Sequence, residues 1–488
     1  MNWGNFDRRD FIAACSFSVA SFIGHRSFAQ STEPSDLTIA QASKLIRSGD
    51  LSPVEIVGAY LTRIDRLDPQ INAFITLTDQ YAVTRARALE AELAAGNWRG
   101  PLHGIPIALK DNIDTEGVLT TAASAVFADR IPEKNAEIVD RLERAGAIIL
   151  GKLNMHEFAY GGSSAITHYK PVHNPWDLDR ITGGSSGGSG AAVAARLCAG
   201  ALGTDTGGSV RIPAAHCGIV GLKATYGLAS IRGIIPLGAS FDHVGPMCRT
   251  VADAALMLQA MAGYDPLDFA SIEAEIPRYS SAMERRTSEL RIGIPRELFY
   301  EDVDPQILSA VSRAHEILSD LTTETEDVDV PALPDLPIVF SEAFAYHAPF
   351  LEAKRELYDP ITLERILRGE DIATSDYVEA KYQLELVRNS IARVFENVDL
   401  LVTPTLPALP IRIADAVTSD ADEGLIRNTM PFNIFGIPSI SLPCGFSREG
   451  LPIGLQISGP ALGELDVLAL AHAYEQVTDW HERAPELT

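Results

Sequence analysis

The chain has 488 residues, 46% of them hydrophobic, and a formal net charge of −25 at pH 7. This length supplies enough apolar material for a large buried core, and the excess of carboxylates argues against non-specific binding to nucleic acid or to an anionic membrane. The body of the chain contains no apolar run long enough for a transmembrane helix. We therefore expect no nucleic-acid partner and no membrane contact.

The N-terminus is typical of a targeting segment. Arg8 and Arg9 stand in the sequence DRRDFI, which resembles a twin-arginine export signal, and a modestly apolar stretch and a small-x-Ala cleavage site (27–29) follow. We expect residues 1–29 to be a signal peptide, residues 30–488 to form a single catalytic domain, and the protein to be periplasmic or secreted. A disordered or amphipathic N-terminal arm, and with it a cytoplasmic protein, is the alternative.

Taken in chain order, the body alternates short apolar strands with helices. Thr38 with Gln41, and Ser52 with Glu55, form two helix capping boxes. Strands are expected at 72–77, 105–109, 147–150, 200–206 and 398–402, and helices at 80–95, 136–145, 307–321 and 375–396. This alternation predicts an α/β sandwich with a mainly parallel sheet. Residues 265–424 carry less pattern, and we expect this region to vary with substrate specificity.

Glycine and serine concentrate in residues 179–215, DRITGGSSGGSGAAVAARLCAGALGTDTGGSVRIPAA. Glycines clustered in this way allow backbone angles and close approaches that a Cβ would forbid. Residues 183–188 would form a loop before a helix of small residues, and a buried strand would lead into the second Gly-Gly-Ser cluster. Ser185 and Ser209 thus stand at two backbone kinks that could converge on one pocket.

Several motifs compete for this segment. The pattern Gly-x-Ser-x-Gly around Ser185 matches a nucleophile elbow, but that elbow needs a hydrophobic strand before it and residues 177–182 make a poor strand. The glycines suggest a phosphate cradle, but the Lys-Ser/Thr ending of a P-loop is missing. A plain Gly/Ser connector is the third alternative, and the second cluster at 205–211 argues against two unrelated linkers.

Lys110 ends an apolar segment, residues 104–109. Lysine is rarely buried without a purpose or a partner. The alternatives to a functional lysine are an ion pair with Asp111 or Asp114, or a surface residue whose stem alone is covered. The five cysteines and eleven histidines lack the spacing of metal ligands, so we expect no metal and no cofactor.

Three ordered motifs, at 104–112, 183–189 and 205–214, closely resemble those of the amidase signature family, and matching segments return at 431–438 and 450–456. The resemblance implies an α/β fold with a large twisted mixed sheet sandwiched between helices. It also implies that Ser209 is the nucleophile, Ser185 a bridging serine on a cis peptide bond, and Lys110 the base. A serine hydroxyl needs such a base, and burial lowers the pKa of a lysine towards the neutral form that can serve.

The resemblance extends to the surroundings of the triad. It implies an oxyanion hole made by the backbone N–H groups of Thr206, Gly207, Gly208 and Ser209. Ser186, Asp205 and Arg211 are expected to support the loops, with Asp205 and Arg211 paired to each other or to loop carbonyls. Met155, Phe158 and Tyr160 are candidates for the acyl pocket, with ordinary core packing as the alternative.

The function that follows is hydrolysis of a small amide through an acyl-enzyme, releasing a carboxylate and ammonia or an amine. The expected partner is a small-molecule amide, and a homodimer is left open. The alternative is the glutamine-hydrolysing A subunit of a tRNA-dependent amidotransferase, which shares the signature. The export signal and the absence of that subunit's Arg-Tyr-Gly segment argue against it. A non-enzymatic binding protein on the same scaffold is disfavoured because Lys110, Ser185 and Ser209 are all present.

Overall fold

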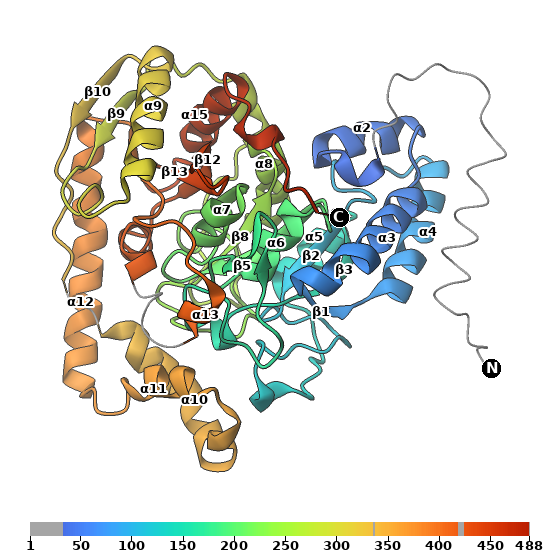
Figure 1. The fold of residues 1–488 in the computed structure, drawn as a ribbon, viewed down its shortest axis with the longest axis horizontal. Coiled ribbons are helices and arrows are strands. Elements are labelled where there is room, and N and C mark those ends of the chain that lie inside the picture. Colours follow the sequence, from blue (N-terminus) through green and yellow to red (C-terminus); the bar gives the residue numbers. More distant parts are fainter. Residues whose placement is uncertain (1–32, 335–336, 418–423, 488) are drawn as a thin grey trace.

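The computed structural model describes residues 33–334, 337–417 and 424–487, so the expected signal peptide lies outside the described residues. Its centre is a sheet of eleven strands (Figure 1). Across the sheet the strands run in the order β1 (Phe74–Leu77), β3 (Ile148–Leu153), β2 (Pro106–Lys110), β6 (Gly200–Asp205), β8 (His243–Cys248), β7 (Val220–Lys223), β12 (Ser439–Phe446), β13 (Pro452–Ser458), β11 (Leu400–Pro404), β9 (Arg291–Ile294) and β10 (Glu324–Asp327).

The sheet is mixed. Strands β3, β2 and β6 are parallel to one another, and so are β11, β9 and β10. The strands between these two groups pair in antiparallel fashion, as does β1 with β3 at the edge. The predicted class, an α/β fold built on a large mixed sheet, is confirmed.

Helices cover both faces of the sheet. Gly454 of β13 lies against Ala215 of α7, where a Cβ on the glycine would stand 2.6 Å from the alanine Cβ. On the other face, Gly445 of β12 lies against Ala310 of α9. The helices are α2 (Ile39–Ser48), α3 (Pro53–Ile71), α4 (Asp79–Ala94), α5 (Glu137–Arg144), α6 (Gly187–Ala194), α7 (Arg211–Cys217), α8 (Val251–Met261), α9 (Pro305–Leu321), α10 (Ile338–Lys354), α11 (Pro360–Leu367), α12 (Thr374–Ser390), α13 (Ile413–Ala416), α14 (Met430–Ile434) and α15 (Glu464–Gln476).

Most expected elements are present within a few residues of their predicted bounds. Both capping boxes form, with Thr38 opening α2 and Ser52 opening α3. One expectation is wrong: the polar segment before Ser185 does form a strand, β5 (Asp177–Ile181). It pairs with β4 (His173–Asn174) in a separate two-stranded sheet. The signal of a buried strand was absent because this hairpin lies outside the main sheet and is only partly covered.

Within the described ranges, no helix is both long enough and apolar enough to cross a bilayer. Nor do those ranges contain a group of three or more His, Cys, Asp or Glu side chains placed to hold a metal ion.

Candidate functional site

The site lies where two parallel strands end side by side. Lys110 is the last residue of β2, and Asp205 is the last residue of the neighbouring β6. Because the strands are parallel, both segments that follow them leave the same edge of the sheet, where open α/β sheets place their ligands. The loop that leaves β6 carries Ser209 and continues into α7.

Lys110 is fully buried and its amine is held by neighbouring oxygens. Nζ lies 2.7 Å from Ser185 Oγ, 2.8 Å from Thr204 Oγ1 and 3.4 Å from the Thr204 carbonyl oxygen. Burial lowers the pKa of this amine to about 7, against a smaller opposing effect of the nearby carboxylates of Asp205 and Asp242. A large fraction of Lys110 is therefore neutral near pH 7, as a general base requires.

The expected alternatives for Lys110 are wrong, because both acids have other partners. Asp111 faces Lys152, a second fully buried lysine, with Nζ and Oδ1 3.6 Å apart. Asp114 forms a bidentate pair with Arg130, at 2.7 and 2.8 Å. Sequence reasoning missed Lys152, because this partner of Asp111 lies on the neighbouring strand β3 and not near it in the chain.

The first glycine–serine loop brings Ser185 to Lys110. The peptide bond between Gly184 and Ser185 is cis, and α6 begins two residues later at Gly187. Ser186 ties this loop to the second one, because its N–H donates to the carbonyl of Ser209 at 3.3 Å. The Ser186 hydroxyl also donates to the Thr204 carbonyl at 3.2 Å. The structure thus brings Lys110 and Ser185 into contact and places the Ser209 loop beside them.

The second loop is folded around the carboxylate of Asp205. Its two oxygens accept hydrogen bonds from the N–H groups of Gly208 (2.8 Å) and Val210 (3.1 Å), one on each side of Ser209. The Gly208 N–H is therefore engaged, which removes it from the predicted group of oxyanion donors. The N–H groups of Thr206, Gly207 and Ser209 have no acceptor within the described chain.

Arg211 holds the carboxylate of Asp205 in place through two hydrogen bonds. The two side chains form a fully buried, bidentate pair at 3.0 and 3.1 Å, as one of the two expected pairings had it. Burial raises the pKa of Asp205, but the Arg211 guanidinium outweighs it and holds the pKa well below its usual range. The carboxylate is therefore charged whenever the protein is folded near neutral pH.

Three groups from the C-terminal part of the chain complete this network. Arg211 donates to the carbonyl of Thr429 (3.0 Å), to Gln456 Oε1 (2.7 Å) and to Asn433 Oδ1 (2.6 Å). Asn433 Nδ2 in turn donates to Asp205 Oδ1 at 2.8 Å. The sequence showed Asn433 and Gln456 only as parts of matching motifs, and nothing in their local pattern predicts this role.

The predicted pocket residues lie in packed clusters. Phe158 is buried among aromatic rings, with its ring centroid 5.3 Å from that of Phe127 and 4.4 Å from that of His347. Met155 is buried in a neighbouring apolar cluster, and Tyr160 borders both. A role in binding an acyl group stays a prediction for all three.

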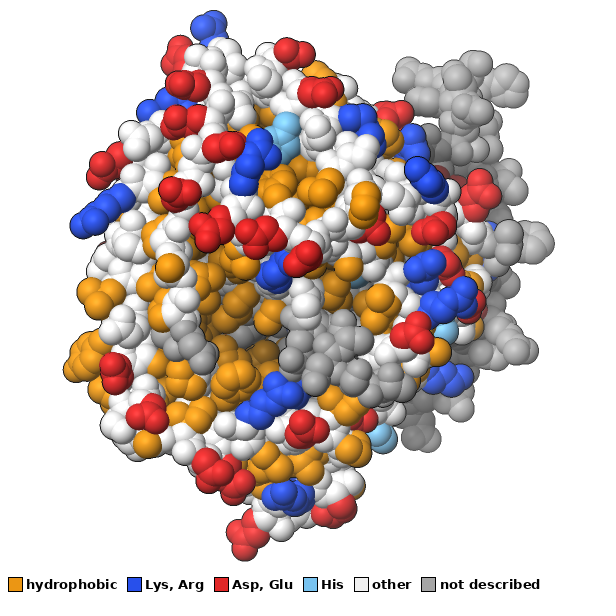
Figure 2. All heavy atoms as spheres, turned by 60° about the vertical axis from the view of Figure 1, so that its left-hand side comes forward, with side chains coloured by type: hydrophobic (Ala, Val, Ile, Leu, Met, Phe, Trp, Pro, Cys, Tyr) orange, Lys and Arg blue, Asp and Glu red, His pale blue; other side chains and the backbone are white. Residues whose placement is uncertain are grey.

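The contacts beside the nucleophile loop are apolar instead. A Cβ on Gly207 would lie 3.0 Å from Met430 Sδ and 3.9 Å from Ile426 Cγ2. Ile426 is partly exposed although it is apolar. Figure 2 is turned so that the left-hand side of Figure 1 comes forward. The face that it shows has a hollow with largely hydrophobic walls.

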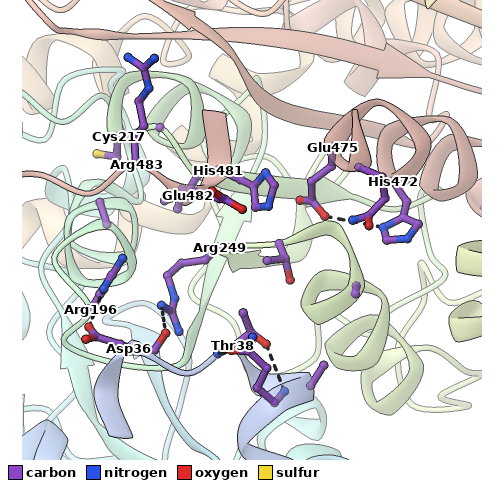
Figure 3. A pocket seen from close by; sticks show the side chains of 18 of the residues that line it. Asp36, Thr38, Arg196, Cys217, Arg249, His472, Glu475, His481, Glu482 and Arg483 are labelled. Carbon is purple, nitrogen blue, oxygen red and sulfur yellow. Dashed lines mark hydrogen bonds and ion pairs between the residues drawn. The ribbon is translucent and has the colours of Figure 1, made fainter. Parts of the chain in front are cut away.

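A separate cavity of about 340 Å³ lies between the start of α2 and the C-terminal segment (Figure 3). Two of its arginines have partners: Arg196 pairs with Asp36 at 2.5 Å, and Arg249 donates to the Asp36 carbonyl at 2.7 Å. None of the three predicted catalytic side chains lines it.

A buried lysine in contact with a serine, beside a second serine on a glycine loop, is the arrangement of a serine hydrolase whose base is lysine. Comparison with known proteins agrees with this class, because the Amidase family model matches residues 55–468. The chain belongs to the amidase family, whose enzymes act on amide C–N bonds.

Similar proteins differ in their named substrates. The A subunit of the glutamyl-tRNA(Gln) amidotransferase of Moorella thermoacetica is 40% identical over 480 residues, which cover 92% of this chain and 98% of the relative. The peptide amidase of Stenotrophomonas maltophilia matches with a TM-score of 0.81 at 30% identity, covering 92% of this chain and 98% of that one. A 6-aminohexanoate cyclic dimer hydrolase matches with a TM-score of 0.85 at 28% identity, covering 93% and 99%.

The first of these relatives overturns an expectation about partners. We expected a small-molecule substrate and no nucleic-acid partner, and left a homodimer open. Relatives 40% and 41% identical to this chain contradict that expectation, because each is named as the A subunit of a glutamyl-tRNA(Gln) amidotransferase. The expectation is wrong because net charge reports only non-specific attraction to nucleic acid. In an assembly, the surface that meets RNA need not belong to the most acidic chain.

Proposed function

We propose that Ser209 is the nucleophile of this enzyme and that Lys110 is its base, acting through Ser185. The observation that carries the proposal is the 2.7 Å contact between Lys110 Nζ and Ser185 Oγ inside a fully buried site. The backbone bond between Ser186 and Ser209 supports it, since it holds the loop of the nucleophile against the loop of the bridging serine.

The reaction proceeds in two acyl-transfer steps. Ser209 Oγ attacks the carbonyl carbon of a carboxamide while its proton passes to Ser185 Oγ and the Ser185 proton passes to neutral Lys110. The C–N bond then breaks, and the leaving nitrogen takes a proton back through Ser185 to depart as ammonia or an amine. Water then attacks the ester formed on Ser209 in the same way, with its proton passing through Ser185 to Lys110. The ester C–O bond breaks, Ser209 takes the proton back, and the carboxylate is released. The N–H groups of Thr206, Gly207 and Ser209 would stabilise the negative oxygen.

For the substrate, we propose the carboxamide of glutamine first, with the chain as the A subunit of a tRNA-dependent amidotransferase. The names of relatives 39–42% identical to it support this choice. In that setting the ammonia released at Ser209 would be passed to a partner subunit rather than to solvent.

A free-standing amidase for a small apolar amide is the second candidate. It is favoured by the side chains beside Gly207, because Ile426 and Met430 offer no charge to the α-ammonium and α-carboxylate of glutamine. The solved structures of a peptide amidase and of a cyclic dimer hydrolase, both similar over more than nine-tenths of this chain, also support it.

One set of assays tests the reaction and separates the candidates. A fluorophosphonate probe should label the wild-type protein and fail to label Ser209→Ala; labelling that survives this change sinks the nucleophile assignment. Ammonia release is then measured with L-glutamine, with N-acetylglycinamide and with benzamide. Turnover of glutamine alone supports the amidotransferase reading, and turnover of the uncharged amides alone supports the free-standing enzyme.

We infer export for the second candidate only, from the twin-arginine-type segment at Arg8 and Arg9. The full-length chain with both arginines replaced by lysine should stay in the cytosol while the unchanged chain is exported. Equal distribution of the two forms would remove the export proposal.

A further inference from the structure

We propose that Thr204, oriented by Asn112, is the positioning residue that prepares Lys110 to receive a proton. The inference rests on the proposed function, because it assigns a role only if Lys110 is the base. It concerns two residues that the triad does not include: Asn112, the last residue of the motif at 104–112, and Thr204, which no motif singled out.

The first argument is a count of donors and acceptors around the amine. A protonated lysine has three N–H donors and no acceptor. Three oxygens lie within hydrogen-bond distance of Lys110 Nζ, and two of them, Oγ1 and the carbonyl oxygen, belong to Thr204. The third, Ser185 Oγ, is the group that exchanges the proton. Among the described residues, Thr204 therefore supplies the acceptors of the ammonium that take no part in the proton exchange.

The second argument is that no carboxylate takes this role. Within the described residues Lys110 forms no ion pair; the acids that act on it, Asp205 and Asp242, do so from a distance. Asp205 is neutralised by Arg211, and Asp242 accepts from Thr206 Oγ1 at 2.5 Å. A contacting carboxylate would hold the proton permanently, whereas neutral oxygens stabilise the ammonium only moderately.

Asn112 fixes the orientation of the threonine. Its Nδ2 donates to Thr204 Oγ1 at 3.1 Å and to the Ile235 carbonyl at 3.3 Å. Since a carbonyl can only accept, the nitrogen of this amide must face that side. Asn112 Oδ1 is left buried without a partner in the described chain, which is unfavourable on its own. The hydrogen bond from Asn112 therefore holds Thr204 Oγ1 in place beside Lys110 Nζ.

The test measures the reactivity of Ser209 without knowing the natural substrate. The rate of labelling by a fluorophosphonate probe is followed from pH 5 to pH 9 for the full-length protein and for Thr204→Val, Thr204→Ser and Asn112→Ala. Thr405→Val is the matched control: Thr405 is also fully buried, and its hydroxyl contacts Ser441 and not the lysine.

We expect Thr204→Val to move the acidic limb of the profile to lower pH by about one unit, a tenfold change in the acid constant, because the ammonium loses one acceptor. The plateau rate should fall about tenfold or more. Thr204→Ser should restore both, Asn112→Ala should shift the limb in the same direction by less, and Thr405→Val should leave it unmoved.

A purely structural role of Thr204 would lower the plateau of the labelling rate and leave the acidic limb of the pH profile in place. That result, measured on folded Thr204→Val, would overturn the inference. If Thr204→Val fails to give a native circular dichroism spectrum, Asn112→Ala provides the test. An acidic limb that does not move in Asn112→Ala would also overturn the inference. Failure of the wild-type protein to label at Ser209 refutes the proposed function instead, so the two failures are distinguishable.

Discussion

Asp205 and Arg211 stand six residues apart and face each other as a fully buried ion pair, with Ser209 on the loop between them. The carboxylate also holds the N–H groups of the two residues that flank the serine. The pair thus sets the shape of the loop rather than touching a substrate. Its removal tests how far the nucleophile depends on a rigid support.

Arg211→Met should destabilise the protein by about 3–5 kcal/mol, because it leaves Asp205 buried without its counter-charge. Urea denaturation followed by fluorescence measures this change. Arg296→Ala is the control, since the Arg296–Asp327 pair is largely exposed, and a change of about 1 kcal/mol or less is expected there. Equal effects of the two substitutions would contradict the role given to Asp205 and Arg211.

Lys110→Met should reduce fluorophosphonate labelling and amide turnover by about 10²–10⁴-fold, the range expected when a general base is removed. The fold should persist, because methionine fills a similar volume and removes a charge that burial disfavours. Lys152→Met is the contrast: it leaves Asp111 unpaired and should lower stability by about 3 kcal/mol. Near-normal turnover by Lys110→Met would require another base.

The rate of acylation should rise with pH through a midpoint near 7 and then level off. The reason is that burial lowers the pKa of Lys110 to about 7, so the neutral amine accumulates above that pH. Labelling rates measured across pH 5–9 give the midpoint. A flat profile over this range would show that the base is not a group titrating near 7.

The same lowered pKa predicts a pH-dependent stability. Between pH 7 and the ordinary lysine value of 10.5, the unfolded chain binds more protons at this position than the folded one, so its contribution to stability rises with pH. The difference in unfolding free energy between Lys110→Met and the wild type should therefore be largest near pH 6 and shrink towards pH 10. A difference that stays constant would contradict a buried, shifted amine.

Gly208→Ala should abolish most activity. Gly208 has a φ of +132°, and a Cβ there would lie 2.1 Å from Thr429 Oγ1, so the loop beside Ser209 must move. A loss of about 1–3 kcal/mol in stability is expected as well. Gly450→Ala is the comparison, because Gly450 has positive φ (+82°) but open space around it. Its activity should stay close to that of the wild type.

The position of the site at the ends of strands could be predicted from local sequence, whereas the roles of Lys110, Ser185 and Ser209 were implied by the resemblance to the amidase signature family. The apolar run before Lys110 and the small residues before Asp205 both form buried strands, and the loops after them carry the polar groups. Pairing of Asp205 with Arg211 was also predictable, since the two are close in the chain.

What could not be predicted depends on contacts between distant segments. Asn433 and Gln456 meet Arg211 across more than 200 positions, and no local pattern reports such a contact. Strand β5 of the hairpin was not predicted, because it is charged and partly exposed and so lacks the apolar pattern of a buried strand. The partner of Asp111 was missed because its lysine lies on a strand 41 positions further along.

The Arg211 network joins a residue that is translated early to residues that are translated late. A nascent polypeptide that ends before Thr429 already contains the lysine and both serines, but lacks every C-terminal group that grips the guanidinium. Its nucleophile loop keeps the Asp205–Arg211 pair but lacks these supporting contacts. We therefore expect Ser209 to become reactive only after β12 and β13 have been translated and docked.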